Sequence, residues 1–161
     1  MPRDPVVGRL ASHEVDALAA LVSEIIADAA VYSERAREEE RAKYTADALR
    51  ERVIEDPDSV LVARVEGQLA GFVLSRYDDG LLWLSWLGVS PPLRGRGLAR
   101  ELLAAAERTA PARRCHALWC DSRTDNAASA SLLTRAGFTR LAELRNHWYG
   151  QDFYLWRKSV G

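Results

Sequence analysis

The first third of the chain carries apolar residues at helical spacing. Seven of them form one stripe: Val15, Leu18, Leu21, Val22, Ile25, Ile26 and Ala29. This spacing predicts a helix that packs on a core, preceded by a short strand over residues 6–10 and capped by Ser12. Between Ser33 and Arg52 charged residues dominate, and we expect a second, mostly solvated helix that ends before Pro57. Its apolar stripe is short and consists of Leu49, Val53 and Ile54.

From residue 59 onward the apolar positions follow the pattern of β-strands. Three strands are predicted, over residues 60–65, 69–77 and 81–89. The turns at Gly67 and Gly80 between them are short, which predicts an antiparallel meander. The third strand is apolar at both the odd and the even positions, as is typical of a central strand covered on both faces. Pro91 and Pro92 end it, because neither can donate a ladder hydrogen bond.

The remaining chain alternates helices with strands. A helix after Pro92 is predicted from an apolar face formed by Leu98, Leu102, Leu103 and Ala106. A buried strand, a further helix and two closing strands follow, over residues 116–120, 126–135, 138–144 and 153–158. No repeat or linker divides the pattern, and 161 residues with 48% apolar content suit one core. We therefore expect a single domain over residues 1–161.

The charge balance narrows the expected partners and the compartment. The chain has 22 Lys and Arg against 23 Asp and Glu, so no net field attracts it to nucleic acid or to an anionic membrane. Pro2, Asp4 and Pro5 interrupt the start, where a secretory signal needs a continuous apolar stretch. No run of about 18 apolar residues occurs elsewhere. We expect a cytoplasmic protein that binds neither nucleic acid nor membrane.

Cysteine and histidine show no metal-binding pattern. Cys115 and Cys120 match neither a disulfide framework nor the usual zinc and redox spacings, so we expect core thiols. The three histidines, His13, His116 and His147, are scattered and have no partner ligand at helical or hairpin spacing. We therefore expect no metal.

The most informative segment is residues 87–99, where the third meander strand passes through a glycine-rich turn into a helix. Backbone amides at a helix start point outward and the helix dipole adds positive potential, so this layout suits an anion. Gly95 and Gly97 let the main chain approach a phosphate without an intervening Cβ. Arg94 and Arg96 add positive charge. An ordinary turn with two solvated arginines is the alternative interpretation.

A dinucleotide-binding turn is a rival interpretation of the same loop. Gly95-x-Gly97 is how the motif G-x-G-x-x-G begins, and Asp121 lies roughly 20 residues further on, where a ribose-binding acid is expected. Three features disfavour this interpretation. The third glycine position is Arg100, residues 90–93 make the turn too long, and the preceding strands form an antiparallel meander.

One short motif carries a family resemblance. Arg94-x-x-Gly97-x-Ala99 resembles the Gln/Arg-x-x-Gly-x-Gly/Ala signature of the GNAT superfamily of acyl-CoA N-acyltransferases. The predicted order of elements is also similar to that fold over nearly the whole chain. The resemblance implies an α/β (α+β) three-layer fold, with a mixed, mostly antiparallel sheet and helices on both faces.

A second segment strengthens the resemblance. Asn126-x-x-Ser129-x-x-Leu132, followed by Gly137-Phe138, resembles the family's Asn-x-x-Ala-x-x-Leu-Tyr…Gly-Phe helix. Two motifs in the right order are far less probable by chance than one. The chain is somewhat similar to the ribosomal-protein N-terminal acetyltransferases within this family.

The resemblance implies acetyl-CoA as the co-substrate. Amides of the glycine-rich loop would hold its pyrophosphate, and the end of the third meander strand would pair with its pantetheine arm, because the parallel strands 81–89 and 116–120 splay apart in this fold. The implied cofactor-binding residues are Leu87, Gly88, Val89, Arg94, Gly95, Arg96, Gly97, Leu98, Ala99, Asn126 and Ser129. For Asn126 a plain helix N-cap remains equally open.

Acetyl transfer needs a neutral amine, and an alkylamine with a pKa of about 10 is mostly protonated at neutral pH, so a base is useful. Asp121 occupies the place of the glutamate base in the related ribosomal-protein acetyltransferases and is our candidate; a turn or capping role is the alternative. The family's tyrosine acid is replaced here by Leu133. Tyr149 is our candidate replacement, and Tyr154 is the other possibility.

The acceptor side is less defined by the sequence. We expect His147 and Trp148 to line the acceptor pocket and the three strand tryptophans, Trp83, Trp86 and Trp119, to be core residues. The acidic run of residues 38–40 is interpreted as a solvated charge run, with attraction of a cationic amine as the alternative.

The expected activity is transfer of an acetyl group from acetyl-CoA directly to a primary amine, in a ternary complex. The acceptor is a small molecule or a peptide N-terminus, and the protein is a monomer or a homodimer. The substitution at Leu133 motivates an alternative from a different class, a catalytically weak acyl-CoA-binding sensor or interaction module.

Overall fold

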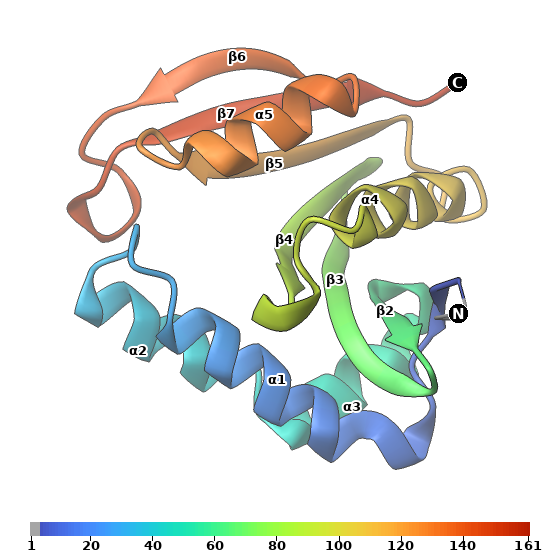
Figure 1. Ribbon diagram of the computed structural model, residues 1–161. Coiled ribbons are helices and arrows are strands. Elements are labelled where there is room, and N and C mark those ends of the chain that lie inside the picture. Colours follow the sequence, from blue (N-terminus) through green and yellow to red (C-terminus); the bar gives the residue numbers. More distant parts are fainter. Residues whose placement is uncertain (1–3) are drawn as a thin grey trace.

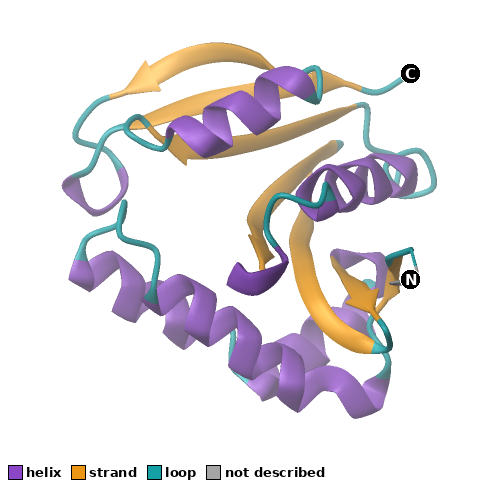
Figure 2. Ribbon diagram, viewed as in Figure 1, coloured by secondary structure: helices purple, strands orange, loops and turns teal. Residues whose placement is uncertain are grey.

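The computed structural model describes residues 4–161 and contains a seven-stranded sheet covered by helices on both faces (Figures 1 and 2). The strands lie in the order β1-β2-β3-β4-β5-β7-β6, and every neighbouring pair is antiparallel except β4 and β5. Their bounds are β1 (Val6–Arg9), β2 (Val60–Val65), β3 (Gln68–Asp78), β4 (Leu81–Val89), β5 (Ala117–Arg123), β6 (Thr139–Leu144) and β7 (Phe153–Ser159). The predicted mixed, three-layer α+β architecture is confirmed, with β4 at the centre.

The helices divide the core into two halves. The helices α1 (Val15–Ala27), α2 (Glu34–Lys43) and α3 (Ala46–Glu55) cover one face, and α4 (Leu98–Thr109) and α5 (Ala127–Arg135) cover the other (Figure 1). Cys115 and Cys120 are free and buried, as predicted. Within residues 4–161 no helix combines the length and the hydropathy needed to cross a bilayer.

The prediction that Ser12 caps the first helix is wrong. The chain enters α1 through a 3₁₀ turn, Ser12–Glu14, and the Ser12 side chain makes no capping hydrogen bond. The carboxylate of Glu14 instead accepts the N–H of Ala11 at 2.9 Å and pairs with Arg64 of β2. The buried Glu14 thus satisfies an orphan amide and fixes α1 to the sheet.

The single charged helix predicted after Ser33 is two helices. Tyr44 leaves the helical region (φ −118°, ψ 49°) and buries its ring in the core, and Thr45 starts α3 by accepting the N–H of Ala48 at 3.2 Å. Within the predicted apolar stripe Leu49 is fully buried, but Ile54 is 80% exposed. Only part of the predicted stripe, Leu49 and Val53, packs in the core.

Both hairpin turns of the meander are formed as predicted. Glu66 and Gly67 have φ values of 52° and 78°, and Asp79 and Gly80 have values of 48° and 89°. Two consecutive positive φ angles are typical of the two-residue turns that match the right-handed twist of the strands. These turns place β2, β3 and β4 side by side.

The parallel ladder between β4 and β5 is short. Only residues 81–83 pair with residues 117–119, whereas β4 continues to residue 89 and β5 to residue 123. A register shift opposite Leu74 and Ser75 leaves Ser85 as an extra residue, and such a bulge bends the strand. The predicted splaying of the two strands is confirmed. The strand β5 is longer than predicted, so Asp121 lies within it rather than at its end.

Candidate active site

The glycine-rich loop lies open in front of α4. Gly95 and Gly97 have φ values of 79° and 80°, and a Cβ added at either would meet no atom within 4 Å. Gly97 is the N-cap of α4, so the amides of residues 98–100 have no partner inside the helix. An anion can therefore reach these amides directly, with the helix dipole in its favour.

The side chains of this loop divide into two roles. Arg94 is exposed, but its Nε donates to the carbonyl oxygen of Val89 at 3.1 Å and so ties the loop to the end of β4. Arg96 is exposed. Leu98 is buried in the core and Ala99 packs against it, so these two residues offer an anion only main-chain groups.

The end of β4 beside this loop is tightly packed. A Cβ added at Gly88 would lie 2.7 Å from Cζ of Phe72 and 3.0 Å from Cγ2 of Ile25. Leu87 and Val89 point to the other face and pack with the α4 cluster. Glycine at position 88 lets α1 and the ring of Phe72 approach the strand that is expected to pair with pantetheine.

Gly88→Ala is expected to destabilise the fold by about 1–3 kcal/mol, because the methyl group overlaps the buried Phe72 ring. Gly8→Ala in β1 is the matched control, since a Cβ there meets nothing within 4 Å. Urea unfolding followed by tryptophan fluorescence measures both. Equal midpoints for the two variants would contradict the packing described above.

Asn126 is the N-cap of α5. Its Oδ1 accepts the N–H of Ser129 at 3.1 Å, so the capping role is confirmed. The first turn of α5 lies next to the end of β5, which carries Asp121. A cofactor role for Asn126 and Ser129 remains a prediction.

Asp121 is a mostly buried carboxyl group on the part of β5 that pairs with β7 but no longer with β4. In residues 4–161 no hydrogen-bond donor or cation contacts its carboxylate, in contrast to Ser122 on the opposite face, which accepts from Trp156 at 2.9 Å. Burial, and then the negative charge of Glu40, raise the pKa of Asp121 to about 7. A carboxyl group with this pKa can accept a proton near neutral pH.

The two candidate tyrosines lie on different sides of the sheet. Asp121 is paired with Leu155, so the preceding residue, Tyr154, points to the face opposite Asp121. There its ring lies 4.3 Å from the Arg140 guanidinium. Tyr149 lies in the 3₁₀ turn Trp148–Gly150, and its hydroxyl donates to Oε2 of Glu40 at 2.8 Å. Tyr149 is thus hydrogen-bonded to Glu40, the carboxylate whose negative charge raises the pKa of Asp121.

Glu40 is not part of a solvated charge run. Its side chain is only 15% exposed, and its Oε1 accepts the indole N–H of Trp86 at 3.1 Å. Lys43, one turn further on, forms an ion pair with it. Burial alone would raise the pKa of Glu40, but hydrogen bonds from Lys43, Tyr149 and Trp86 lower it below its usual range. The prediction from the sequence is therefore wrong for this residue.

Aromatic rings surround these carboxylates. Tyr32 lies 5.3 Å from Trp86 and 6.3 Å from Phe153, and Trp148 lies 5.2 Å from Phe153. Further contacts join Trp83 to Trp148 (6.2 Å) and His147 to Trp148 (4.3 Å). Trp86 packs against the core under α1 and α3, as expected, but Trp83 and Trp119 are partly exposed, so the expectation that they are core residues is wrong for these two. Two acids and an aromatic wall thus gather where β4 and β5 separate.

Comparisons with known proteins identify the family of this chain. The Acetyltransferase (GNAT) family matches residues 23–138. The chain belongs to the GNAT family. It is 41% identical over 73 residues to an acetyltransferase of Pectobacterium atrosepticum, covering 45% of this chain and 52% of the relative. It is 39% identical over 77 residues to one of Sodalis glossinidius, covering 48% and 54%. The chain thus spans about half the length of the curated relatives it matches.

Solved structures share the GNAT fold over nearly the whole chain. The PaiA N-acetyltransferase of Thermoplasma acidophilum in complex with coenzyme A superposes with a TM-score of 0.82 at 19% identity, covering 98% of this chain and 99% of the other. The ribosomal-protein-alanine N-acetyltransferase of Brucella melitensis has a TM-score of 0.76 at 24% identity, covering 96% and 99%. At these identities the likeness concerns the fold.

The sequence predicts that Leu133 takes the position of the tyrosine in the GNAT helix motif. The side chain is 5% exposed and packs in the core between α5 and the sheet. It therefore cannot donate a proton and contributes only to packing. Among residues 4–161 the tyrosine whose hydroxyl contacts a carboxylate near Asp121 is Tyr149, which belongs to another element.

Arg123 is a residue that the sequence analysis missed. Its Nε donates to the carbonyl of Val31 at 2.8 Å and its Nη1 to that of Asp152 at 2.6 Å. The N–H of Ser33 also donates to Oε1 of Gln151 at 3.0 Å. These bonds join the turn after α1 to the β6–β7 loop, and Figure 1 shows the two segments meeting. No sequence motif marks Arg123, because its partners are main-chain carbonyls far away in the chain.

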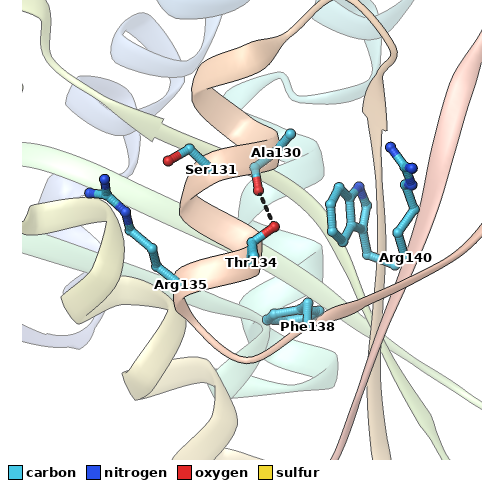
Figure 3. Close-up of a pocket in the computed structure, with 7 residues that line it drawn as sticks. Ala130, Ser131, Thr134, Arg135, Phe138 and Arg140 are labelled. Atoms are coloured by element: carbon cyan, nitrogen blue, oxygen red, sulfur yellow. Dashed lines mark hydrogen bonds between the residues drawn. The ribbon is translucent and has the colours of Figure 1, made fainter.

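Two hollows lie away from this site. An open groove of about 550 Å³ runs beside α5 and is lined by Ala130, Ser131, Thr134, Arg135, Phe138, Arg140 and Trp156 (Figure 3). A cavity of about 210 Å³ lies between α4 and α5 and shares Arg135 and Phe138 with it. Neither hollow is lined by Asp121 or by the glycine-rich loop, so both lie outside the candidate active site.

Proposed function

We propose that the protein is an acetyl-CoA-dependent N-acetyltransferase that moves the acetyl group directly to a primary amine in a ternary complex. The observation that carries the proposal is the mostly buried, unpartnered carboxyl group of Asp121, with a pKa raised to about 7, beside the gap between β4 and β5. Family membership and the open amides at the start of α4 support acetyl-CoA as the donor. The acceptor is a small-molecule amine or a peptide N-terminus.

The residues present fit acetyl-CoA. The amides of Gly95, Gly97 and the first turn of α4 would hold its pyrophosphate, because the space in front of them is open and the dipole is favourable. The unpaired main chain at the end of β4, around residues 87–89, would pair with the pantetheine amides. Asn126 and Ser129 at the start of α5 would contact the cofactor from the opposite side.

In this mechanism Asp121 accepts a proton from the acceptor's ammonium group. The neutral nitrogen then attacks the thioester carbonyl, the new C–N bond forms, and the C–S bond breaks as the thiolate leaves. The nitrogen releases its second proton to solvent as the amide forms. A thiol with a pKa of about 8.5 is a fair leaving group, so protonation of the sulfur is helpful rather than essential. Tyr149 is the proposed proton donor, and His147 and Trp148 would line the acceptor pocket.

A binding module is the second candidate function. Leu133 in place of the family's tyrosine favours it, and so does the bond that commits the hydroxyl proton of Tyr149 to Glu40. Such a protein would bind acetyl-CoA at the same loop and release no thiol.

A thiol-release assay with acetyl-CoA and a panel of primary amines and peptides separates the two functions. An acetyltransferase is expected to release thiol at least roughly tenfold faster with one acceptor than with acetyl-CoA alone, because attack by a bound amine with a positioned base is accelerated. Calorimetric titration with acetyl-CoA is run in parallel. Tight binding without acceptor-dependent release from any member of the panel would favour the binding module.

A further inference from the structure

Glu40 joins three elements that are distant in sequence. From α2 its carboxylate accepts a hydrogen bond from Trp86 of β4 at 3.1 Å and another from Tyr149 of the β6–β7 loop at 2.8 Å. Lys43 completes the set with an ion pair and lies 3.4 Å from the Tyr149 hydroxyl. Hydrogen bonds to a charged acceptor are stronger than neutral ones, so this carboxylate is well placed to fix its donors.

The Tyr149 end of this arrangement needs such a contact. Tyr149 has a φ of 56° and Asn146, earlier in the same loop, has a φ of 46°. Left-handed conformations of residues other than glycine persist only where surrounding contacts hold them. The Asp152 carboxylate accepts the N–H of Asn146 at 2.7 Å and holds the base of the loop. The carboxylate of Glu40 holds its tip.

Glu40 also acts electrostatically on Asp121. Its negative charge raises the pKa of Asp121. The other ionisable groups near Asp121 are Tyr32, after α1, and Cys120, the preceding residue of its strand, and both are neutral at pH 7 because burial raises their pKa values. The Arg123 guanidinium donates hydrogen bonds to two main-chain carbonyls and forms an ion pair with the exposed Asp125. Glu40 is the charged group that raises the pKa of Asp121, so its removal is expected to lower that pKa.

We propose that Glu40 is the positioning residue of the acceptor site: its carboxylate fixes Tyr149 against α2, and its negative charge acts on the proposed base, Asp121. This inference rests on the proposed function, because it assigns Asp121 and Tyr149 to the acceptor side of an acetyltransferase. It makes α2 a part of the site, although the helix carries none of the GNAT motifs.

Glu40→Gln is the test, with Glu39→Gln as the matched control, since Glu39 lies on the same helix and pairs only with Arg35 on the surface. In Glu40→Gln the KM for the acceptor is expected to rise about tenfold, because Tyr149 loses a charged partner. The acid limb of kcat/KM is expected to move to lower pH, because loss of the negative charge lowers the pKa of Asp121. Glu39→Gln is expected to match the unsubstituted protein in both.

A second variant separates the two effects. Glu40→Asp keeps the charge but withdraws it from Tyr149 and Trp86, so the KM is expected to rise while the acid limb keeps its position. Affinity for coenzyme A, measured by calorimetry, is expected to stay within about twofold in all three variants and reports on folding. If Glu40→Gln does not fold, the inference is judged on Glu40→Asp alone. A raised KM with an unchanged acid limb supports it, and an unchanged KM contradicts it.

A titration of the Asp121 carboxyl group by ¹³C NMR needs no acceptor and keeps this inference separate from the proposed function. A lower pKa of Asp121 in Glu40→Gln than in Glu39→Gln is the expected result. The proposed function fails if no amine supports thiol release, whatever the titration shows. The inference fails if Glu40→Gln and Glu39→Gln agree in the titration, or if an active protein shows only one of the two kinetic changes.

Discussion

Gly97→Trp is expected to weaken the binding of coenzyme A by about a hundredfold or more. The Cβ at this position would face open space in front of α4, so an indole ring there would fill the volume that the pyrophosphate needs and cover the free amides of the first turn. Loss of two or three hydrogen bonds to a charged phosphate accounts for an effect of this size. Isothermal titration with coenzyme A measures it.

The left-handed backbone at Gly97 requires a matched control. Any side chain there costs about 1 kcal/mol through its φ of 80° alone. Gly67→Trp carries the same strain, because Gly67 has a φ of 78° and open space around its Cβ, but it lies in the β2–β3 turn. It is expected to bind coenzyme A normally. Equal affinities for the two variants would exclude the loop as the pyrophosphate site.

Most of the fold could be predicted because local patterns decide it. The positive φ angles at Gly67 and Gly80 require glycine turns, and the two prolines after β4 end that strand. The break at Tyr44 could not be predicted from charge periodicity. It depends on burial of the Tyr44 ring and on the cap at Thr45, both of which compete with a continuous helix.

The cofactor side of the candidate site could be predicted from local sequence, whereas the acceptor side could not. The cofactor side consists of main-chain groups in a continuous segment, so Gly95 and Gly97 mark it in the sequence. The acceptor side consists of side chains from α2, β4, β5 and the β6–β7 loop. Glu40 follows two other glutamates, and nothing local distinguishes it from them. Only the approach of Trp86 and Tyr149 makes it an interior carboxylate.

Asp121→Asn tests the acceptor side directly and is expected to lower kcat by about 10²- to 10⁴-fold, which is the usual contribution of a positioned base. In the unsubstituted protein kcat/KM is expected to fall below about pH 7, because the protonated Asp121 can no longer accept a proton. The variant is expected to lack this limb. Asp125→Asn, at an exposed acid on the same segment, is the control and is expected to keep both the rate and the limb.

The same substitution is expected to stabilise the fold at alkaline pH. Asp121 ionises near pH 3.8 when solvated and near pH 7 in the folded protein, because burial and Glu40 disfavour its charge. As the pH rises between these values, the unfolded chain releases a proton that the folded protein retains, so the unsubstituted protein loses stability relative to Asp121→Asn, by on the order of a few kcal/mol above pH 7. Urea unfolding at pH 4 and pH 8 measures the difference. A variant that loses turnover without gaining stability at pH 8 would show that the carboxyl group is solvated, and a solvated carboxyl group would be too weak a base for the proposed role.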